Sequence, residues 1–155
     1  PGALVLSDRP RATRYALLAA EEALQQAGLR AGAIPSERLG VVLGTTMGSK
    51  ELWLAALRAG YRAGAPEQTP GPMEPWGNDA PARALARRVG AGVLRVVSTA
   101  CASGNAALGA ALDLLREGAC DVVLAGGVDA VQGYVIAGFG ADSYRLALRA
   151  AIGRL

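Results

Sequence analysis

Three short apolar runs, rich in Val and Leu and separated by longer helical patterns, constrain the fold of this sequence most. They are residues 39–43 (LGVVL), 94–98 (LRVVS) and 121–125 (DVVLA), and glycines follow the first and the third. Apolar runs this short, bounded by glycine, predict buried strands. Because helical segments separate them, they predict right-handed βαβ units, a mostly parallel sheet and an α/β fold.

Helical periodicity fills the segments between these runs. In residues 11–28, Tyr15, Leu18, Ala19 and Ala23 share one stripe, and the final glycine is a natural C-terminal cap. Residues 64–79 are rich in Pro and Gly and predict a loop. The other predicted helices are 51–62, 80–89, 104–117 and 145–152.

The composition argues against a membrane protein and against a nucleic-acid-binding protein. No uncharged apolar stretch reaches the length of about 18 residues that a membrane span needs, and the opening Pro1-Gly2-Ala3 does not resemble a signal peptide. The formal net charge is +3, and the arginines are scattered. They fit either solvated helix faces or a basic rim for an acidic partner. Aromatic residues are not interleaved with them as on a nucleic-acid surface.

The two cysteines, Cys101 and Cys120, do not form a disulfide framework in a chain of 155 residues. We therefore expect a reducing, cytoplasmic setting. The chain contains no histidine, which restricts every catalytic hypothesis below. Neither a cofactor nor a metal site is predicted.

Cys101 is the strongest candidate for chemistry. It lies in VSTACASGN (97–105), between the end of a predicted strand and the start of a predicted helix. The free N–H groups of a first helical turn and the helix dipole would favour its thiolate and hold an oxyanion formed from a thioester. The alternative is a buried structural cysteine. That is our expectation for Cys120, which has no helix start beside it.

The surroundings of Cys101 resemble the nucleophile region of the β-ketoacyl synthases. The family pattern is T-A-C-x-S-G, an Ala-rich helix and then D-V-V-L-A-G-G; here TACASG occupies 99–104 and DVVLAGG occupies 121–127. Residues 14–28, 37–46 and 137–141 also resemble the family, the last as a turn with a gating phenylalanine. The resemblance spans residues 11–141.

This resemblance implies a thiolase-like, layered αβαβα fold, of which the chain supplies mostly the first half. Cys101 would accept an acyl group from an acyl carrier protein or coenzyme A, and a malonyl thioester would then lose carbon dioxide and attack the acyl-enzyme. The implied substrate-binding residues are Met47, Phe139 and Thr99, although ordinary core packing would also explain Met47 and Phe139. The resemblance further implies fatty-acid or polyketide biosynthesis and a homodimer that pairs near residues 95–98.

The chain departs from the family towards its end. A complete synthase is far longer and has two similar halves, and its second half carries two catalytic histidines and a Gly-rich turn. Residues 142–155 resemble only a short piece of that half. We therefore predict that residues 1–141 form the half that carries the nucleophile and that residues 142–155 are a short piece of the second half. Either an internal deletion joins the two, or the segments between them are not included in these 155 residues. Such a chain would self-acylate but not condense.

Two other functions stay open. The lack of histidine favours a non-catalytic, synthase-like partner subunit, whereas the intact cysteine motif argues against one. A thiolase-type acyl-coenzyme A transferase would share the fold, but the sequence around its cysteine is different. Relatives that only decarboxylate lack the cysteine, so Cys101 excludes them.

Overall fold

The computed structural model describes residues 9–30, 32–64, 77–133 and 135–141. Within these ranges every predicted helix and strand is confirmed, with ends within two residues of the expected ones. The predicted helix at 145–152 lies outside the described residues, as does most of the predicted loop at 64–79. The elements are α1 (Arg11–Gln26), the short 3-10 helix η1 (Ser36–Arg38), β1 (Leu39–Gly44), α2 (Lys50–Arg62), α3 (Ala80–Val89), β2 (Val93–Val97), α4 (Ser103–Arg116) and β3 (Val122–Gly127).

One sequence expectation is wrong. The segment resembling a turn with a gating phenylalanine is helical over the described residues 135–141. The amide groups of Val135 and Ile136 both donate to the carbonyl oxygen of Gln132, at 3.0 and 3.1 Å, and so begin a helical turn. The turn was implied only by the family resemblance, and the glycines at 138 and 140 weaken a helix without forbidding it.

The three strands form one parallel sheet in the order β2-β1-β3. In this register Val42 on the central strand lies opposite Arg95 on β2 and Ala125 on β3. The parallel sheet confirms the prediction from the spacing of the apolar runs. All three strands therefore end at the same edge of the sheet.

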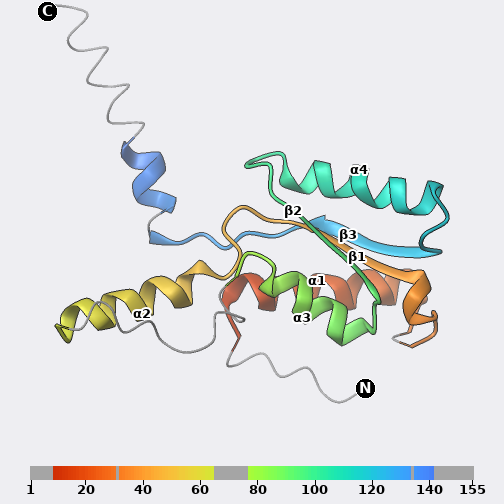
Figure 1. Cartoon of the computed structure of the whole chain (residues 1–155), viewed down its shortest axis with the longest axis horizontal. Helices are drawn as coiled ribbons and strands as arrows, with labels where there is room; N and C mark the ends of the chain where they lie inside the picture. The colour runs from red at the N-terminus through yellow and green to blue at the C-terminus, as the bar shows by residue number, and fades with distance from the viewer. Residues whose placement is uncertain (1–8, 31, 65–76, 134, 142–155) are drawn as a thin grey trace, which may run out of the picture.

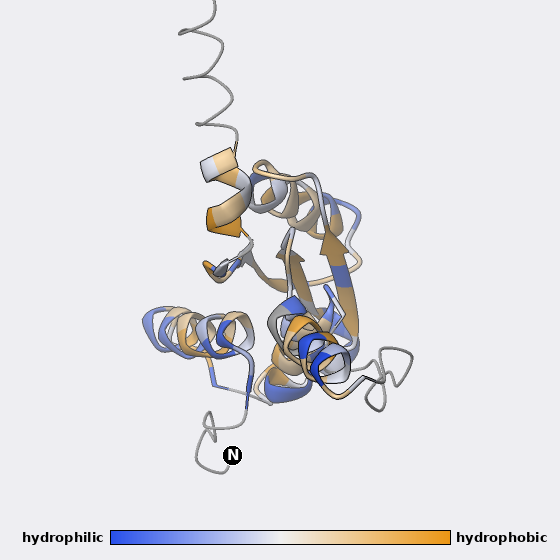
Figure 2. Ribbon diagram, turned by 90° about the vertical axis from the view of Figure 1, so that its left-hand side faces the viewer, coloured by the Kyte–Doolittle hydropathy of each residue, from blue (hydrophilic) through white to orange (hydrophobic). Residues whose placement is uncertain are grey.

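Helices cover both faces of the sheet (Figure 1). Helix α4 lies over one face, α1 and α3 lie over the other, and α2 extends away to the side. Figure 2 shows the mainly apolar strands between these layers. The central strand β1 is buried along its whole length, because it has a neighbouring strand on each side and helices above and below.

Alternation along β1 divides the core into two parts. Leu39 and Val41 pack with Leu17 of α1 and Leu85 of α3. On the other face, Val42 packs in a second cluster with side chains of α4, namely Ala107, Ala111 and Leu114, and with Cys120. Cys120 is only 3% exposed, which agrees with a structural role.

Candidate active site

An apolar pocket lies at the strand ends, where β1 and β3 finish and α4 begins. Ligands of open parallel sheets bind at this edge. The pocket has a volume of about 520 Å³. Its lining comes from the ends of β1 and β3, the turn before α4 and the helical residues 135–141: Gly44, Thr46, Met47, Ala100, Cys101, Ser103, Gly104, Gly127, Val128, Asp129, Ala130, Val131, Val135 and Phe139.

Three of the four predicted site residues meet in this pocket. Cys101, Met47 and Phe139 all line it. Cys101 is exposed, so it is not a buried structural cysteine. Phe139 is 69% exposed, so core packing does not explain it. The fourth residue, Thr99, is not among the lining residues, and its role in substrate binding stays a prediction.

The turn that presents Cys101 has an unusual backbone. Ala100 has φ of +52°, a left-handed conformation that residues with a Cβ atom rarely adopt. The buried Ser103 side chain holds this turn closed: its hydroxyl donates to the carbonyl oxygen of Ala100 at 2.6 Å and accepts from the amide of Thr99 at 2.9 Å. Local strain of this kind concentrates at functional sites.

The helix start differs from our expectation in one respect. Helix α4 begins at Ser103, after the N-cap residue Ala102, so Cys101 precedes the cap. The amides of Ala102 and Ser103 donate to the carbonyl oxygens of Thr99 and Ala100. These two N–H groups close the turn and therefore do not point at the sulfur. The positive end of the helix dipole still lies beside Cys101.

Glycines let the strands approach α4 closely. A Cβ atom on Gly44 would lie 2.1 Å from the carbonyl oxygen of Ser103. A Cβ atom on Gly127 would lie 2.9 Å from the Cα atom of Gly104. Any side chain at either strand position would push the first turn of α4, and with it Cys101, away from the sheet.

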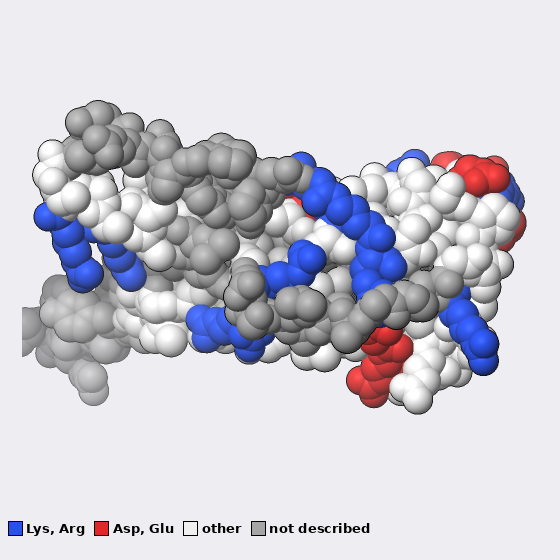
Figure 3. Space-filling model, turned by 90° about the horizontal axis from the view of Figure 1, so that it is seen from below, with Lys and Arg blue, Asp and Glu red and all other residues white. Residues whose placement is uncertain are grey.

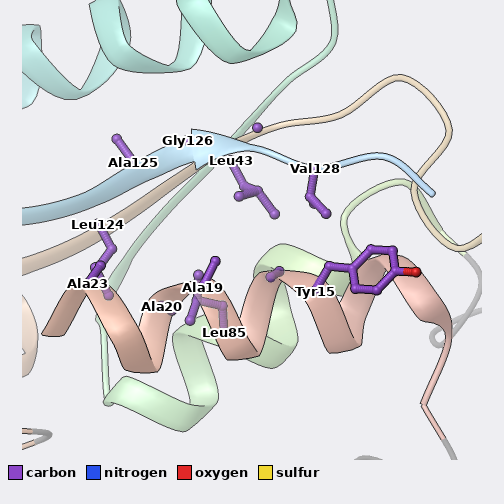
Figure 4. A pocket seen from close by; sticks show the side chains of 12 residues that line it. Tyr15, Ala19, Ala20, Ala23, Leu43, Leu85, Leu124, Ala125, Gly126 and Val128 are labelled. Atoms are coloured by element: carbon purple, nitrogen blue, oxygen red, sulfur yellow. The ribbon is translucent and has the colours of Figure 1, made fainter. Parts of the chain in front are cut away.

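A second pocket, beside α1, offers much less chemistry. It has a volume of about 220 Å³ and lies between α1 and β3 (Figure 4). The only polar side-chain group in its lining is the hydroxyl of Tyr15, which Figure 4 shows directed away from the other labelled side chains. This pocket contains no nucleophile and is not a candidate active site.

Basic side chains gather on the face formed by α1 and α3. Figure 3 shows more Lys and Arg than Asp and Glu on this side of the described chain. Arg9, Arg83 and Arg87 line an open hollow of about 210 Å³ there. Two arginines of α3 also form ion pairs, Arg83 with Asp79 at 3.0 Å and Arg88 with Glu21 at 2.7 Å. This face is compatible with both interpretations from the sequence, a solvated surface and a basic rim for an acidic partner.

Comparison with known proteins decides the family. The model of the β-ketoacyl synthase N-terminal domain matches residues 8–146, most of the chain. This chain belongs to the β-ketoacyl synthase family. The curated relatives of this synthase chain include the ketoacyl synthase alpha subunit of the tetracenomycin polyketide synthase from Streptomyces glaucescens, 35% identical over 77% of the chain and 30% of the relative. Another is the chloroplastic 3-oxoacyl-[acyl-carrier-protein] synthase I of Hordeum vulgare, 34% identical over 76% of the chain and 27% of the relative.

Solved structures of the family confirm the thiolase-like fold. The ishigamide ketosynthase/chain length factor matches with a TM-score of 0.73 and 32% identity, over 89% of this chain and 35% of its own. A type II polyketide ketosynthase solved in complex with its acyl carrier protein matches with a TM-score of 0.71 and 29% identity, over the same shares. The synthase chain thus spans about a third of the length of its relatives.

Two further observations concern the limits of the synthase chain. The predicted change of domain at residue 141 and the piece at 142–155 lie at and beyond the end of the described residues, and both stay predictions. No helix in the described part is both long and apolar enough to cross a membrane. The cytoplasmic setting stays a prediction as well.

Proposed function

We propose that this chain supplies the acyl-accepting thiol of a β-ketoacyl–acyl-carrier-protein synthase, with Cys101 as the nucleophile. One observation supports the proposal above all: an exposed cysteine opens onto an apolar pocket of about 520 Å³ at the start of α4. Met47 and Phe139 also line this pocket. Apolar walls suit the hydrocarbon part of an acyl group.

The proposed first step is acyl transfer. The Cys101 thiolate attacks the carbonyl carbon of an acyl thioester, and a tetrahedral oxyanion forms. When it collapses, the bond to the departing sulfur breaks, and the released thiolate takes up the proton that the Cys101 thiol gave to solvent. The acyl chain would then lie along Met47 and Phe139.

The second step in the family is condensation with a malonyl thioester after loss of carbon dioxide, assisted by two histidines. These 155 residues contain no histidine and span about a third of the relatives' length. We therefore propose that the 155 residues, taken alone, stop at the acyl-enzyme. Condensation would need groups that the family supplies from its second half.

Intact mass spectrometry after incubation with an acyl thioester tests the first step. We expect one acyl adduct, which peptide mapping places on Cys101 and which hydroxylamine removes. Cys101→Ala should abolish the adduct, and the matched variant Cys120→Ala should keep it, because Cys120 is buried. A wild-type protein that stays unmodified, or carries the adduct elsewhere, would refute the proposal.

The rival functions give different outcomes. A non-catalytic partner subunit has no need of an activated cysteine, so iodoacetamide at neutral pH would label Cys101 no faster than a free thiol in a peptide. A synthase nucleophile should be labelled faster than that. A thiolase-type transferase would condense acyl groups without a malonyl thioester. The chain can therefore be mixed with the second half of a relative and assayed for condensation. Condensation that requires malonyl thioester would support a synthase.

We also propose that an acyl carrier protein delivers the acyl group and docks on the basic face of α1 and α3. Carrier proteins are acidic, and Arg9 and Arg87 line the hollow there. Arg9→Glu with Arg87→Glu should slow acylation from the acyl carrier protein but not from acyl-N-acetylcysteamine, which is small and uncharged. The charge-preserving pair Arg9→Lys with Arg87→Lys is the control. Equal slowing with both donors would contradict docking at this face.

The homodimer implied by the family would use the outer edge of β2. Within the described residues this strand pairs only with β1, on one side, and Leu94 and Arg95 are exposed on it. A free strand edge can pair with another strand. Pairing of two copies here would join their sheets into one, which hydrogen exchange of the β2 amides would detect as slowing with rising concentration.

A further inference from the structure

The carboxylate of Asp129 joins the ends of the two strands that border the pocket. Asp129 follows β3, and its side chain accepts hydrogen bonds from the turn after β1. The hydroxyl of Thr45 donates to Oδ1 at 2.8 Å, the amide of Met47 donates to Oδ1 at 2.8 Å, and the amide of Thr46 donates to Oδ2 at 3.0 Å. One side chain therefore fixes three consecutive residues that lie more than 80 positions earlier in the chain.

A second hydrogen bond carries this anchor to the turn before Cys101. The hydroxyl of Thr46 donates to the carbonyl oxygen of Ala100 at 3.0 Å. Ala100 is the residue with left-handed φ, and it immediately precedes Cys101. Because a residue with a Cβ atom disfavours this conformation, neighbouring contacts must hold it. Thr46 supplies one such contact, and it comes from outside the turn.

Asp129 is badly placed to act as a base, although it lines the same pocket as Cys101. Both of its carboxylate oxygens already accept N–H or O–H groups of the 45–47 turn. Such a carboxylate is suited to holding a backbone in place. No hydrogen bond joins Asp129 to Cys101 in the described structure, and the hydrogen-bonded route from Asp129 to the turn before Cys101 runs through Thr46.

We propose that Asp129 is a positioning residue for Cys101: it fixes Thr46, and Thr46 holds Ala100 in the conformation that directs the thiol into the pocket. The kinetic part of this inference rests on the proposed acylation of Cys101. The structural part, the dependence of Ala100 on Asp129 and Thr46, does not.

The kinetic test measures the acylation rate of Cys101 against thioester concentration in Asp129→Ala and Thr46→Val. We expect the limiting rate to fall by about tenfold or more in each, since small misplacements of reacting groups have effects of this size. In Thr46→Val, which leaves the hydrogen bond from Met47 to Asp129 in place, the half-saturating concentration should change little. The double variant should be no slower than the slower single variant, and Thr46→Ser should recover most of the loss. Asp113→Ala, at an exposed carboxylate of α4, is the control.

A spectroscopic test is independent of acylation. The ¹³C shifts of Ala100 report its φ in labelled protein, and they should leave the left-handed range in Asp129→Ala and Thr46→Val but not in Asp113→Ala. If wild-type protein is not acylated, the proposed function fails, while this measurement still decides the positioning role.

Circular dichroism establishes that each variant is folded, and Thr46→Val carries the test if Asp129→Ala does not fold. Unchanged Ala100 shifts together with an unchanged limiting rate would overturn the proposal. So would independent, multiplying effects of the two substitutions, because they would show that Asp129 does not act through Thr46.

Discussion

Gly44 shows how little room separates β1 from the turn that presents Cys101. The nearest atom to a Cβ at this position would be a backbone carbonyl oxygen, that of Ser103, at 2.1 Å. Backbone cannot rotate out of the way as the tip of a flexible side chain can. The position therefore has a steric requirement for glycine that no apolar pattern reveals.

We expect Gly44→Ala to lower the free energy of unfolding by about 1–3 kcal/mol, because it overpacks the contact between β1 and α4. Urea denaturation followed by circular dichroism measures this change. The matched control is Gly109→Ala, in the middle of α4, where a Cβ meets nothing within 4 Å. That variant should be about 0.5–1 kcal/mol more stable, since alanine favours helix. Equal changes in the two variants would contradict the steric explanation.

Single residues differ in how far the sequence reveals them. The place of Cys101 in the pocket could be predicted, because a cysteine between a strand and a helix leaves a local motif. Asp129 and Thr46 could not, since their hydrogen bond joins segments more than 80 residues apart. The only signal was the position of Asp129 two residues after the end of a strand. The left-handed φ of Ala100 also had no signal, because alanine is not a residue that predicts it.

An ion pair ties together the starts of β1 and β3. Arg38 of η1 donates from Nε to Asp121 at 3.0 Å, and a second guanidinium nitrogen contacts the other carboxylate oxygen. The Arg38 guanidinium also donates to the carbonyl oxygen of Gly118 at 2.6 Å. The backbone amide of Asp121 donates to the carbonyl oxygen of Arg38 at 2.8 Å. The two strands are therefore aligned at the end opposite the pocket.

This pair predicts a pH dependence of stability. Hydrogen bonding from Arg38 holds the pKa of the Asp121 carboxyl below its ordinary value. A carboxyl whose pKa is lower in the folded state stabilises the protein above its unfolded-state pKa of about 4. The contribution is lost as the pH falls through the folded-state value. Asp121→Asn should therefore be less stable than wild type at neutral pH, and the difference should shrink in acid.

Urea denaturation at a series of pH values between neutral and strongly acidic measures the difference. Arg38→Gln removes the other partner and should show the same narrowing of the gap to wild type. In a double-mutant cycle, the two substitutions should not be additive. A gap that stays constant across the whole pH range would show that Asp121 acts through something other than its charge.

Helices and strands were predicted well because their signals are local. Leu39, Val41 and Val42 mark a strand buried on both faces, and the structure places them in cores on opposite sides of the sheet. The order β2-β1-β3 depends on pairing between distant segments, which periodicity does not encode. Residues 137–141 were wrongly expected to form a turn, because that expectation came from the family resemblance and not from a local pattern in these residues.

Helix α4 buries some of its apolar side chains and leaves others exposed. Ala107, Ala111 and Leu114 turn one side of α4 to the sheet. The side next to this buried row carries Leu108, Leu112 and Leu115, which are 54%, 45% and 41% exposed. An apolar row of this length on a helix surface is typical of a contact face.

We expect the isolated chain to associate through this row beyond any dimer that pairs along β2, as its concentration rises. Leu108→Glu combined with Leu112→Glu should lower the sedimentation coefficient at high concentration, without loss of helical signal. Leu18→Glu is the control: this leucine is 50% exposed but lies on α1, across the sheet. A wild-type chain that sediments as a monomer at every concentration would refute the expectation.

The contact of Gly44 with Ser103 and of Gly127 with Gly104 has a consequence for how this pocket can evolve. Where these glycines line the pocket its wall is main chain, so a substitution there cannot deepen or shorten the cavity without moving Cys101. Changes in the size of the accepted molecule must therefore come from side chains elsewhere in the lining, among them Met47, Val131 and Phe139. Relatives with different substrates should vary at those three positions while keeping the glycines, which makes these side chains the place to redesign selectivity.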